Sequence, residues 1–338
     1  MVSSKNVKEA KRINHVLLLH NAKDGGITAG IFGKKGAGKT TEAINLAENV
    51  AYIDPRTGQA HRETVIWCAQ GVDYWTSLDL NRVHVFHHVD YLPTFYAEDT
   101  SEIEPPVRPG HMHHYTSTVD LIRKILPGMI NVIYSPKVFR FSKEVADEIE
   151  HAGMLKKSLS DDDVKINPDM FWFEMLHYLR KRKHRLFFVT VIMDEAGRLL
   201  PENTSRERFA VQGWFIELES IHLRRSNISF FIFAHSAGGI DWRYHDKIMI
   251  YGWMKGAKPN SLSMLNKKLT FYLNRGVIIL EESGLYGNLD VPYVAQRPLI
   301  YAEYEDRSDE ADTEDFDYRE SIERQVPPAG VGIYQGTG

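Results

Sequence analysis

The chain has 338 residues, of which 43% are hydrophobic and 25% charged, an ordinary composition for a soluble globular protein. No apolar run is long enough to cross a bilayer, and the lysine-containing start lacks the apolar segment of a signal peptide. The single cysteine, Cys68, excludes an intrachain disulfide and suits a reducing compartment. We therefore expect a location in the cytoplasm, or inside a virus that assembles there.

Charge is distributed unevenly along the chain. Residues 303–324 contain eleven Asp or Glu and three Arg, a local balance of −8, so the remainder carries +4 of the total of −4. A mildly basic body is compatible with a polyanionic partner. The high charge and few apolar residues near the C-terminus predict disorder. We expect an N-terminal extension (1–26), one α/β domain (27–302) and an acidic tail (303–338).

Within residues 27–302, short apolar runs alternate with amphipathic helical stretches, which is typical of an α/β domain with a largely parallel sheet. Buried strands are predicted at 27–32, 64–69, 83–89, 130–134, 186–193 and 228–234, edge strands at 247–251 and 277–280, and a further strand at 15–20. Helices are predicted at 40–50, 121–126, 168–182 and 209–225. Four prolines and Gly110 between residues 91 and 115 predict a long surface loop.

Residues 33–40 (GKKGAGKT) match the pattern G-x-x-x-x-G-K-[ST], between a predicted strand and a predicted helix. Its glycines allow a tight turn that points backbone N–H groups at phosphate oxygens, and the helix start adds its positive dipole end. The predicted nucleotide-binding residues are Gly33, Lys34, Lys35, Gly36, Ala37, Gly38, Lys39, Thr40 and Thr41. We expect Lys39 to reach the β- and γ-phosphates and the Thr40 hydroxyl to ligate Mg²⁺. The flanking elements disfavour the alternative of a simple connecting turn.

A second motif is the apolar run 187–193, which ends in Asp194 and Glu195. This is typical of a Walker B strand, in which Asp194 would hold Mg²⁺ and Glu195 would act as general base on the attacking water. The alternative is two ordinary acids at a strand end, for example a helix cap. The Asp-Glu pair favours a hydrolysing motor over a small-molecule kinase. Because no N-K-x-D motif for guanine is present, ATP is preferred to GTP.

His235 follows the apolar run 228–234, about forty residues after the acids. A polar side chain at the tip of a buried strand can sense the γ-phosphate, so His235 is a candidate catalytic residue. A histidine that caps a loop is the alternative.

The order of these motifs resembles the FtsK–HerA superfamily of P-loop ATPases, which includes viral genome-packaging ATPases. The helix ending in His222-Leu223-Arg224-Arg225 and the segments 240–248 and 273–279 are also similar to that group. The likeness spans roughly residues 27–298 and implies a RecA/ASCE-like fold and a homohexameric ring. It also implies an arginine that reaches a neighbouring subunit's γ-phosphate, for which Arg224 and Arg225 are candidates and Arg243 the second choice. Each could instead be a surface or DNA-facing arginine, and His235 departs from the glutamine usual at the sensor position.

The function expected from this resemblance is ATP-driven translocation of double-stranded DNA without sequence preference, as in a viral packaging motor docked on a capsid or membrane-vertex protein. The alternatives are a HerA-like helicase, a secretion ATPase, and an ATP-switched morphogenesis protein similar to zonula occludens toxin-like phage proteins. No cluster of acids suggests a nuclease centre, which disfavours a large terminase.

Several polar groups have two interpretations. The basic run 180–185 is either a DNA-backbone contact or, as we favour, a solvated helix end. Other candidate DNA-facing residues are Lys255, Lys258, Lys267 and Lys268. The histidines at 84, 87, 88, 111, 113 and 114 lack the matched spacing of a zinc site, so surface or strand positions are favoured.

Overall fold

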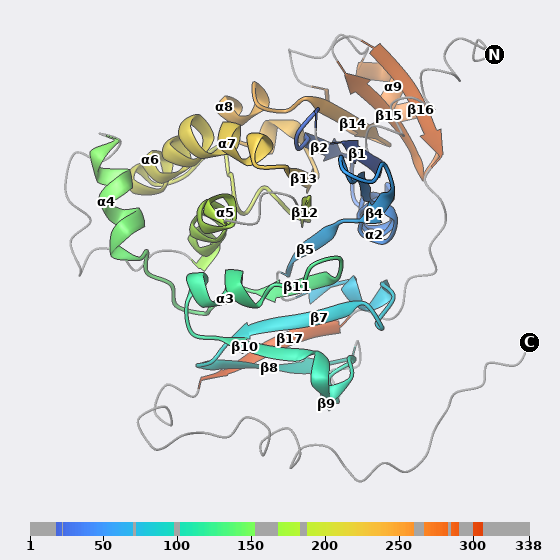
Figure 1. Cartoon of the computed structure of the whole chain (residues 1–338). Coiled ribbons are helices and arrows are strands. Elements are labelled where there is room, and N and C mark those ends of the chain that lie inside the picture. Colours follow the sequence, from blue (N-terminus) through green and yellow to red (C-terminus); the bar gives the residue numbers. More distant parts are fainter. Residues whose placement is uncertain are drawn as a thin grey trace, which may run out of the picture.

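A large central sheet organises the fold (Figure 1). The computed structural model describes residues 18–21, 23–69, 72–97, 102–152, 168–182, 188–259, 267–282, 285–290 and 300–306. Ten strands follow one another in the sheet in this order: β10 (Met112–Tyr115), β7 (Val83–His88), β11 (Ile130–Tyr134), β5 (Thr64–Ala69), β12 (Val189–Met193), β13 (Ile228–Ala234), β2 (Thr28–Phe32), β14 (Ile250–Met254), β15 (Val277–Glu282) and β16 (Leu285–Asp290). The first eight are parallel, and β15 and β16 extend the sheet through antiparallel pairs. The expected α/β fold with a largely parallel sheet is confirmed.

Helices cover both faces of this sheet, which is why its central strands are apolar throughout rather than alternating. The α-helices are α2 (Lys39–Asn49), α3 (Thr118–Lys124), α4 (Lys143–His151), α5 (Phe171–Lys181), α6 (Arg206–Trp214), α7 (Ser220–Arg225), α8 (Trp242–His245) and α9 (Lys267–Tyr272). One core cluster joins the sheet to α3 and α5–α8, and a second joins the opposite face to α2. Short helical turns are η1 (Trp75–Ser77), η2 (Pro109–His111), η3 (Pro168–Met170), η5 (Ala237–Gly239) and the π-helix η4 (Phe215–Glu219).

Two smaller sheets flank the central one. The first contains β1 (Leu19–Asn21), β3 (Ala51–Ile53) and β4 (Ala60–Arg62). The second contains β6 (Val72–Asp73), β17 (Ile300–Asp306), β8 (Tyr91–Tyr96) and β9 (Glu102–Ile103), in that order. β17 begins before the segment assigned to the acidic tail and extends into it.

The prediction of a long loop at 91–115 was wrong. β8 lies there, and Tyr91, Pro93 and Phe95 alternate as buried residues in this strand. Pro93 led us to predict a loop in spite of this period-two pattern. Proline can occur in a strand at a position where the neighbouring strand does not require a backbone N–H donor. The same stretch also contains β9, η2 and β10.

The two predicted edge strands lie inside the sheet instead. β14 pairs with β2 on one side and β15 on the other, and β15 pairs with both β14 and β16. β16 carries few apolar residues, so hydrophobic periodicity gave no sign of the strand that covers β15. The predicted helix at 209–225 is divided into α6, the π-helix η4 and α7. None of the helices in the described ranges is both long and apolar enough to span a membrane.

A candidate nucleotide-binding site at the ends of three adjacent strands

The predicted site residues follow three neighbouring strands, β12, β13 and β2. In register, Met193 of β12 lies opposite Ile232 of β13, and Ala234 lies opposite Phe32 of β2. Parallel strands end at the same edge of a sheet, which is where open α/β sheets bind their ligands. The segments after these strands are therefore brought together, although about 40 to 200 residues separate them along the chain.

The loop after β2 has the backbone geometry that its glycines allow. Gly36 and Gly38 have φ of 76° and 107°, in the region that favours glycine. The Ala37 N–H donates to the Lys34 carbonyl (3.1 Å), and the Gly33 N–H donates to the Ala234 carbonyl of β13 (3.2 Å). α2 begins directly after Gly38, so this loop presents the N-terminus of a helix with its unpaired N–H groups.

Lys39 turns its ammonium group back over this loop. Its Nζ donates to the Gly33 carbonyl (2.9 Å) and lies 3.4 Å from the Lys34 carbonyl. The residue is only 6% exposed, and burial lowers its pKa, while the charges of Asp194 and Glu195 act in the opposite direction. A buried cation at the centre of the loop is suited to an anionic ligand.

Thr40 and Asp194 meet across the site. The Thr40 hydroxyl donates to Asp194 Oδ2 at 3.0 Å, although 154 residues separate the two. Burial raises the pKa of Asp194, as does the charge of Glu195, while the hydrogen bonds from Thr40 and the Glu195 N–H lower it. A hydroxyl and a carboxylate in contact are hard oxygen ligands that fit Mg²⁺.

Glu195 and His235 form a second contact at the mouth of the site. Glu195 has φ of 55°, rare for a residue other than glycine, and its side chain is half-exposed. His235 Nε2 lies 3.2 Å from Glu195 Oε1, and His235 Nδ1 lies 3.3 Å from Lys39 Nζ. A neutral imidazole with its proton on Nε2 satisfies both contacts, because Nδ1 then accepts from the ammonium. His235 therefore bridges Glu195 and Lys39, the lysine of the phosphate-binding loop at residues 33–40 (the P-loop). No sequence pattern indicated this link.

The loops after β12 and β13 are themselves joined. The Ala196 N–H donates to the Phe233 carbonyl (2.9 Å), and the Asp241 N–H donates to the Leu200 carbonyl (2.9 Å). Further along, Pro201 and Ile240 form an isolated β-bridge. These backbone contacts fix the position of Glu195 relative to His235 despite the unusual φ of the acid.

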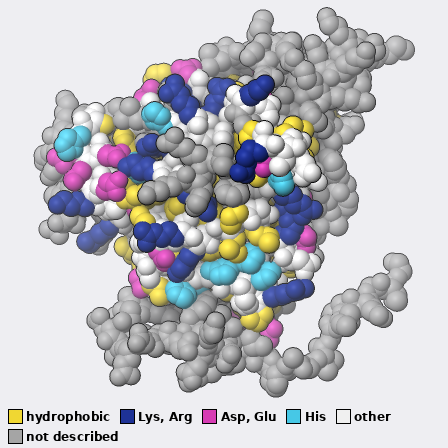
Figure 2. All heavy atoms as spheres, viewed as in Figure 1, with side chains coloured by type: hydrophobic (Ala, Val, Ile, Leu, Met, Phe, Trp, Pro, Cys, Tyr) yellow, Lys and Arg dark blue, Asp and Glu magenta, His cyan; other side chains and the backbone are white. Residues whose placement is uncertain are grey.

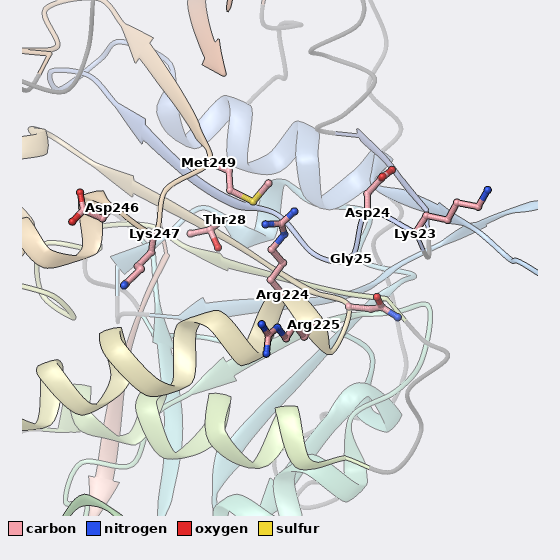
Figure 3. A pocket seen from close by; sticks show the side chains of 10 residues that line it. Lys23, Asp24, Gly25, Thr28, Arg224, Arg225, Asp246, Lys247 and Met249 are labelled. Atoms are coloured by element: carbon pink, nitrogen blue, oxygen red, sulfur yellow. The ribbon is translucent and has the colours of Figure 1, made fainter. Parts of the chain in front are cut away.

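Arg224 and Arg225 lie at the opposite edge of the sheet. They end α7 immediately before β13, whose seven residues span about 23 Å, so neither reaches the P-loop of its own chain. Both are exposed and line a pocket of about 670 Å³ that also contains Lys23 and Lys247. Figure 3 shows the Arg224 side chain reaching toward Thr28 and Met249 in this pocket.

Arg243 is held within its own subunit. Its guanidinium bonds Asp241 through two nitrogens, at 3.0 and 2.5 Å, and donates to the Phe209 carbonyl at 3.1 Å. It also lies over the Phe209 ring, 3.7 Å from the centroid. These partners fit a packing role, which leaves Arg224 and Arg225 as the more accessible cations.

The basic run 180–185 is described only as far as residue 182. Lys181 bonds Glu144 (2.8 Å) and Glu148 (2.7 Å) and so ties α5 to α4. This fits the favoured interpretation of a helix end rather than a DNA contact. Lys258 is exposed and Lys255 partly exposed, whereas the side chains of Lys267 and Lys268 lie outside the described part.

The histidines gather over β7 and β10, on the face shown in Figure 2. His84 Nδ1 lies 2.9 Å from His113 Nε2, and the His84 and His111 rings stack with centroids 4.1 Å apart. Within the described ranges, the three-residue group spaced for a metal ion is Glu144, Glu148 and His177, whose carboxylates Lys181 already bridges. The histidine stretch gives no three-ligand group there, in line with the strand interpretation.

The sequence matches no known family model and no curated protein. Among solved structures, the genome packaging NTPase B204 from Sulfolobus turreted icosahedral virus 2 in complex with sulfate is similar, with 11% identity and a TM-score of 0.43 over 81% of this chain and 99% of that one. The N-terminal domain of zonular occludens toxin from Neisseria meningitidis has 11% identity and a TM-score of 0.29, over 82% and 94% of the two chains. The cytoplasmic domain of the Thermomonospora curvata type VII secretion ATPase EccC has 14% identity and a TM-score of 0.32, over 84% and 24%.

These three solved structures share 11 to 14% identity with this chain, at TM-scores of 0.29 to 0.43. A packaging NTPase, a toxin domain and a secretion ATPase correspond to three of the functions that the sequence leaves open. At these identities and TM-scores, the likenesses do not decide among those functions.

Proposed function

We propose that this chain is an ATP-hydrolysing motor that translocates double-stranded DNA, of the kind that packages a viral genome. The observation that carries the hydrolysis is the convergence of Lys39, Thr40, Asp194, Glu195 and His235 at one sheet edge, through contacts of 3.0 to 3.3 Å. The DNA part of the proposal is supported by the sequence resemblance and by the basic body of the chain.

Each side chain has a distinct task in this proposal. The N–H groups of the P-loop and the Lys39 ammonium bind the phosphates of ATP. Thr40 and Asp194 would hold Mg²⁺, which when bound neutralises charge on the phosphate oxygens. Glu195 accepts a proton from the attacking water. His235 orients the Glu195 carboxylate and keeps it within reach of the P-loop lysine.

The site is completed by a neighbouring subunit in the proposed assembly. Arg224 and Arg225 lie about 23 Å from His235 of their own chain and can serve only another chain's phosphates. In a ring of identical subunits each interface is head-to-tail, so two different surface patches of neighbouring subunits meet there. We infer a homohexamer in which this pair contacts the γ-phosphate bound next door.

Mixing two inactive variants tests this arrangement. Arg224→Ala/Arg225→Ala should reduce kcat at least about 100-fold, because a trans arginine stabilises charge in the transition state. When it is mixed with Lys39→Ala, some interfaces combine an intact P-loop with an intact arginine pair, and ATP hydrolysis should reappear. Arg123→Ala, which removes an exposed arginine on α3, serves as control. A mixture as inactive as its components would show that the pair does not act in trans.

Duplex DNA should raise the ATPase rate several-fold if translocation uses the hydrolysis. The test compares kcat with and without long double-stranded DNA of unrelated sequences, at low and high salt, since backbone contacts weaken with salt. If duplex DNA leaves kcat unchanged while Lys39→Ala still abolishes it, the translocase must be abandoned in favour of an ATP-switched assembly protein.

The remaining elements of the proposal follow from this function. A packaging motor acts in the host cytoplasm or at the virion and docks on a capsid or membrane-vertex protein.

A further inference from the structure

The chain between β14 and β15 returns beside the P-loop and is tied to it at both ends. The Lys34 N–H donates to the Lys255 carbonyl (3.1 Å) directly after β14, and the Gly276 N–H donates to the Ala37 carbonyl (3.1 Å) directly before β15. A Cβ at Gly38 would lie 3.5 Å from the Gly276 Cα, so the two loops are in close contact.

A buried threonine fixes the helix in this connection. The Thr270 hydroxyl of α9 donates to the Ala257 carbonyl (2.6 Å), and its carbonyl accepts from the Gly256 N–H (2.9 Å). Thr270 is fully buried, whereas the next two residues, Phe271 and Tyr272, are 59% and 83% exposed. Only residues 271–275 lie between the anchor at Thr270 and the anchor at Gly276.

Phe271 and Tyr272 place two adjacent aromatic side chains in water, and an exposed apolar patch can mark a ligand-binding site. Tyr272 is four residues from Gly276, so its Cα lies at most about 14 Å from the Gly276 Cα that contacts the P-loop. The aromatic pair is thus confined to the surroundings of the phosphate-binding loop. A ligand bound at the P-loop is therefore the occupant that we consider for this pair.

The strand order indicates which part of that ligand is near. The groups suited to the γ-phosphate, Glu195 and His235, follow β12 and β13 on one side of β2. α9 connects β14 to β15, on the other side of β2. A triphosphate whose terminal group faces His235 therefore directs its remaining part, the ribose and base, toward β14 and α9.

We propose that Tyr272, assisted by Phe271, is the platform on which the adenine ring of the bound ATP stacks. This assignment rests on the proposed function, because it takes the P-loop to bind the triphosphate. Base–aromatic stacking is typically strong enough to change affinity several-fold per base. In this proposal the Tyr272 ring contacts the adenine and the P-loop binds the phosphates. The contribution of the adenine to affinity can therefore be measured separately from that of the phosphates.

The test measures the affinity of the full chain for ATP and for inorganic tripolyphosphate, which lacks the base. Tyr272→Ala should weaken ATP binding at least about fivefold and leave tripolyphosphate binding unchanged, whereas Tyr272→Phe should retain ATP binding. In Tyr272→Ala, the Phe271 ring could stack on the base in place of the lost ring. The double variant Phe271→Ala/Tyr272→Ala removes both rings and so excludes this substitution of one for the other. Trp242→Ala is the matched control, because this tryptophan is 64% exposed on α8, outside the connection between β14 and β15.

The outcomes separate the two proposals. Unchanged ATP affinity in the double variant overturns the stacking platform, and so does an equal loss of both ligands, which would place the effect on the phosphates or the fold. Binding of neither ligand by the unaltered chain would instead overturn the nucleotide site itself. Fluorescence of the Tyr272→Trp variant that is quenched by ATP and not by tripolyphosphate would support the platform independently.

Discussion

Replacing Lys39 by alanine is expected to abolish ATP hydrolysis, lowering kcat at least about 100-fold, as does the loss of a single preorganised donor in other active sites. The Lys39 ammonium is buried above the P-loop, 2.9 Å from the Gly33 carbonyl. Steady-state phosphate release and ATP affinity together measure the effect.

Lys143→Ala is the matched control for this variant. Lys143 is exposed at the start of α4, outside the phosphate-binding loop, so its charge is screened by water and contributes little. A Lys143→Ala protein with near-normal kcat beside an inactive Lys39→Ala protein would show that the loss is specific to the buried ammonium. Equal activity of the two variants would exclude Lys39 from hydrolysis.

Glu195→Gln is expected to bind ATP normally and hydrolyse it about 100- to 10,000-fold more slowly, which is the typical contribution of a general base. The amide keeps the shape of the side chain and its contact with His235 but cannot take a proton from water. Single-turnover hydrolysis, measured with an ATP-binding assay on the same sample, separates the chemical step from binding.

Glu202→Gln provides the comparison for this second variant. Glu202 is exposed in the loop that follows Glu195 and should tolerate the change. Turnover of the Glu195→Gln protein at the rate of the unaltered chain would remove Glu195 from the mechanism, and loss of ATP binding would show that the acid shapes the pocket instead.

The central part of the fold could be predicted because its strands are buried on both faces. Continuous apolar runs such as 64–69, 130–134 and 228–234 gave β5, β11 and β13 with the same bounds. The phosphate-binding loop was also predictable, since glycine at positions 36 and 38 is needed for positive φ before a helix. The local sequence was enough in both cases, because the burial of a strand and the positive φ of a glycine each depend on a few neighbouring residues.

Features that depend on tertiary contacts could not be predicted. β8 is stabilised by its pairing with β17, more than 200 residues later, and its proline indicated a loop. The bridging position of His235 depends on the registers of three strands, and only the fold places Arg224 far from its own P-loop. Nothing in the sequence indicated that the exposed aromatic residues of α9 lie near the phosphate-binding loop, because this depends on the contact between Gly276 and Ala37.

A crystal structure with Mg²⁺ and a non-hydrolysable ATP analogue tests the central claim most directly. We predict phosphates on N–H groups at the start of α2, such as those of Gly38, Lys39 and Thr40, the ion at Thr40 and Asp194, and Glu195 facing the terminal phosphate. A nucleotide bound elsewhere, for example in the pocket of Arg224 and Arg225 of the same subunit without contact to any P-loop, would contradict it.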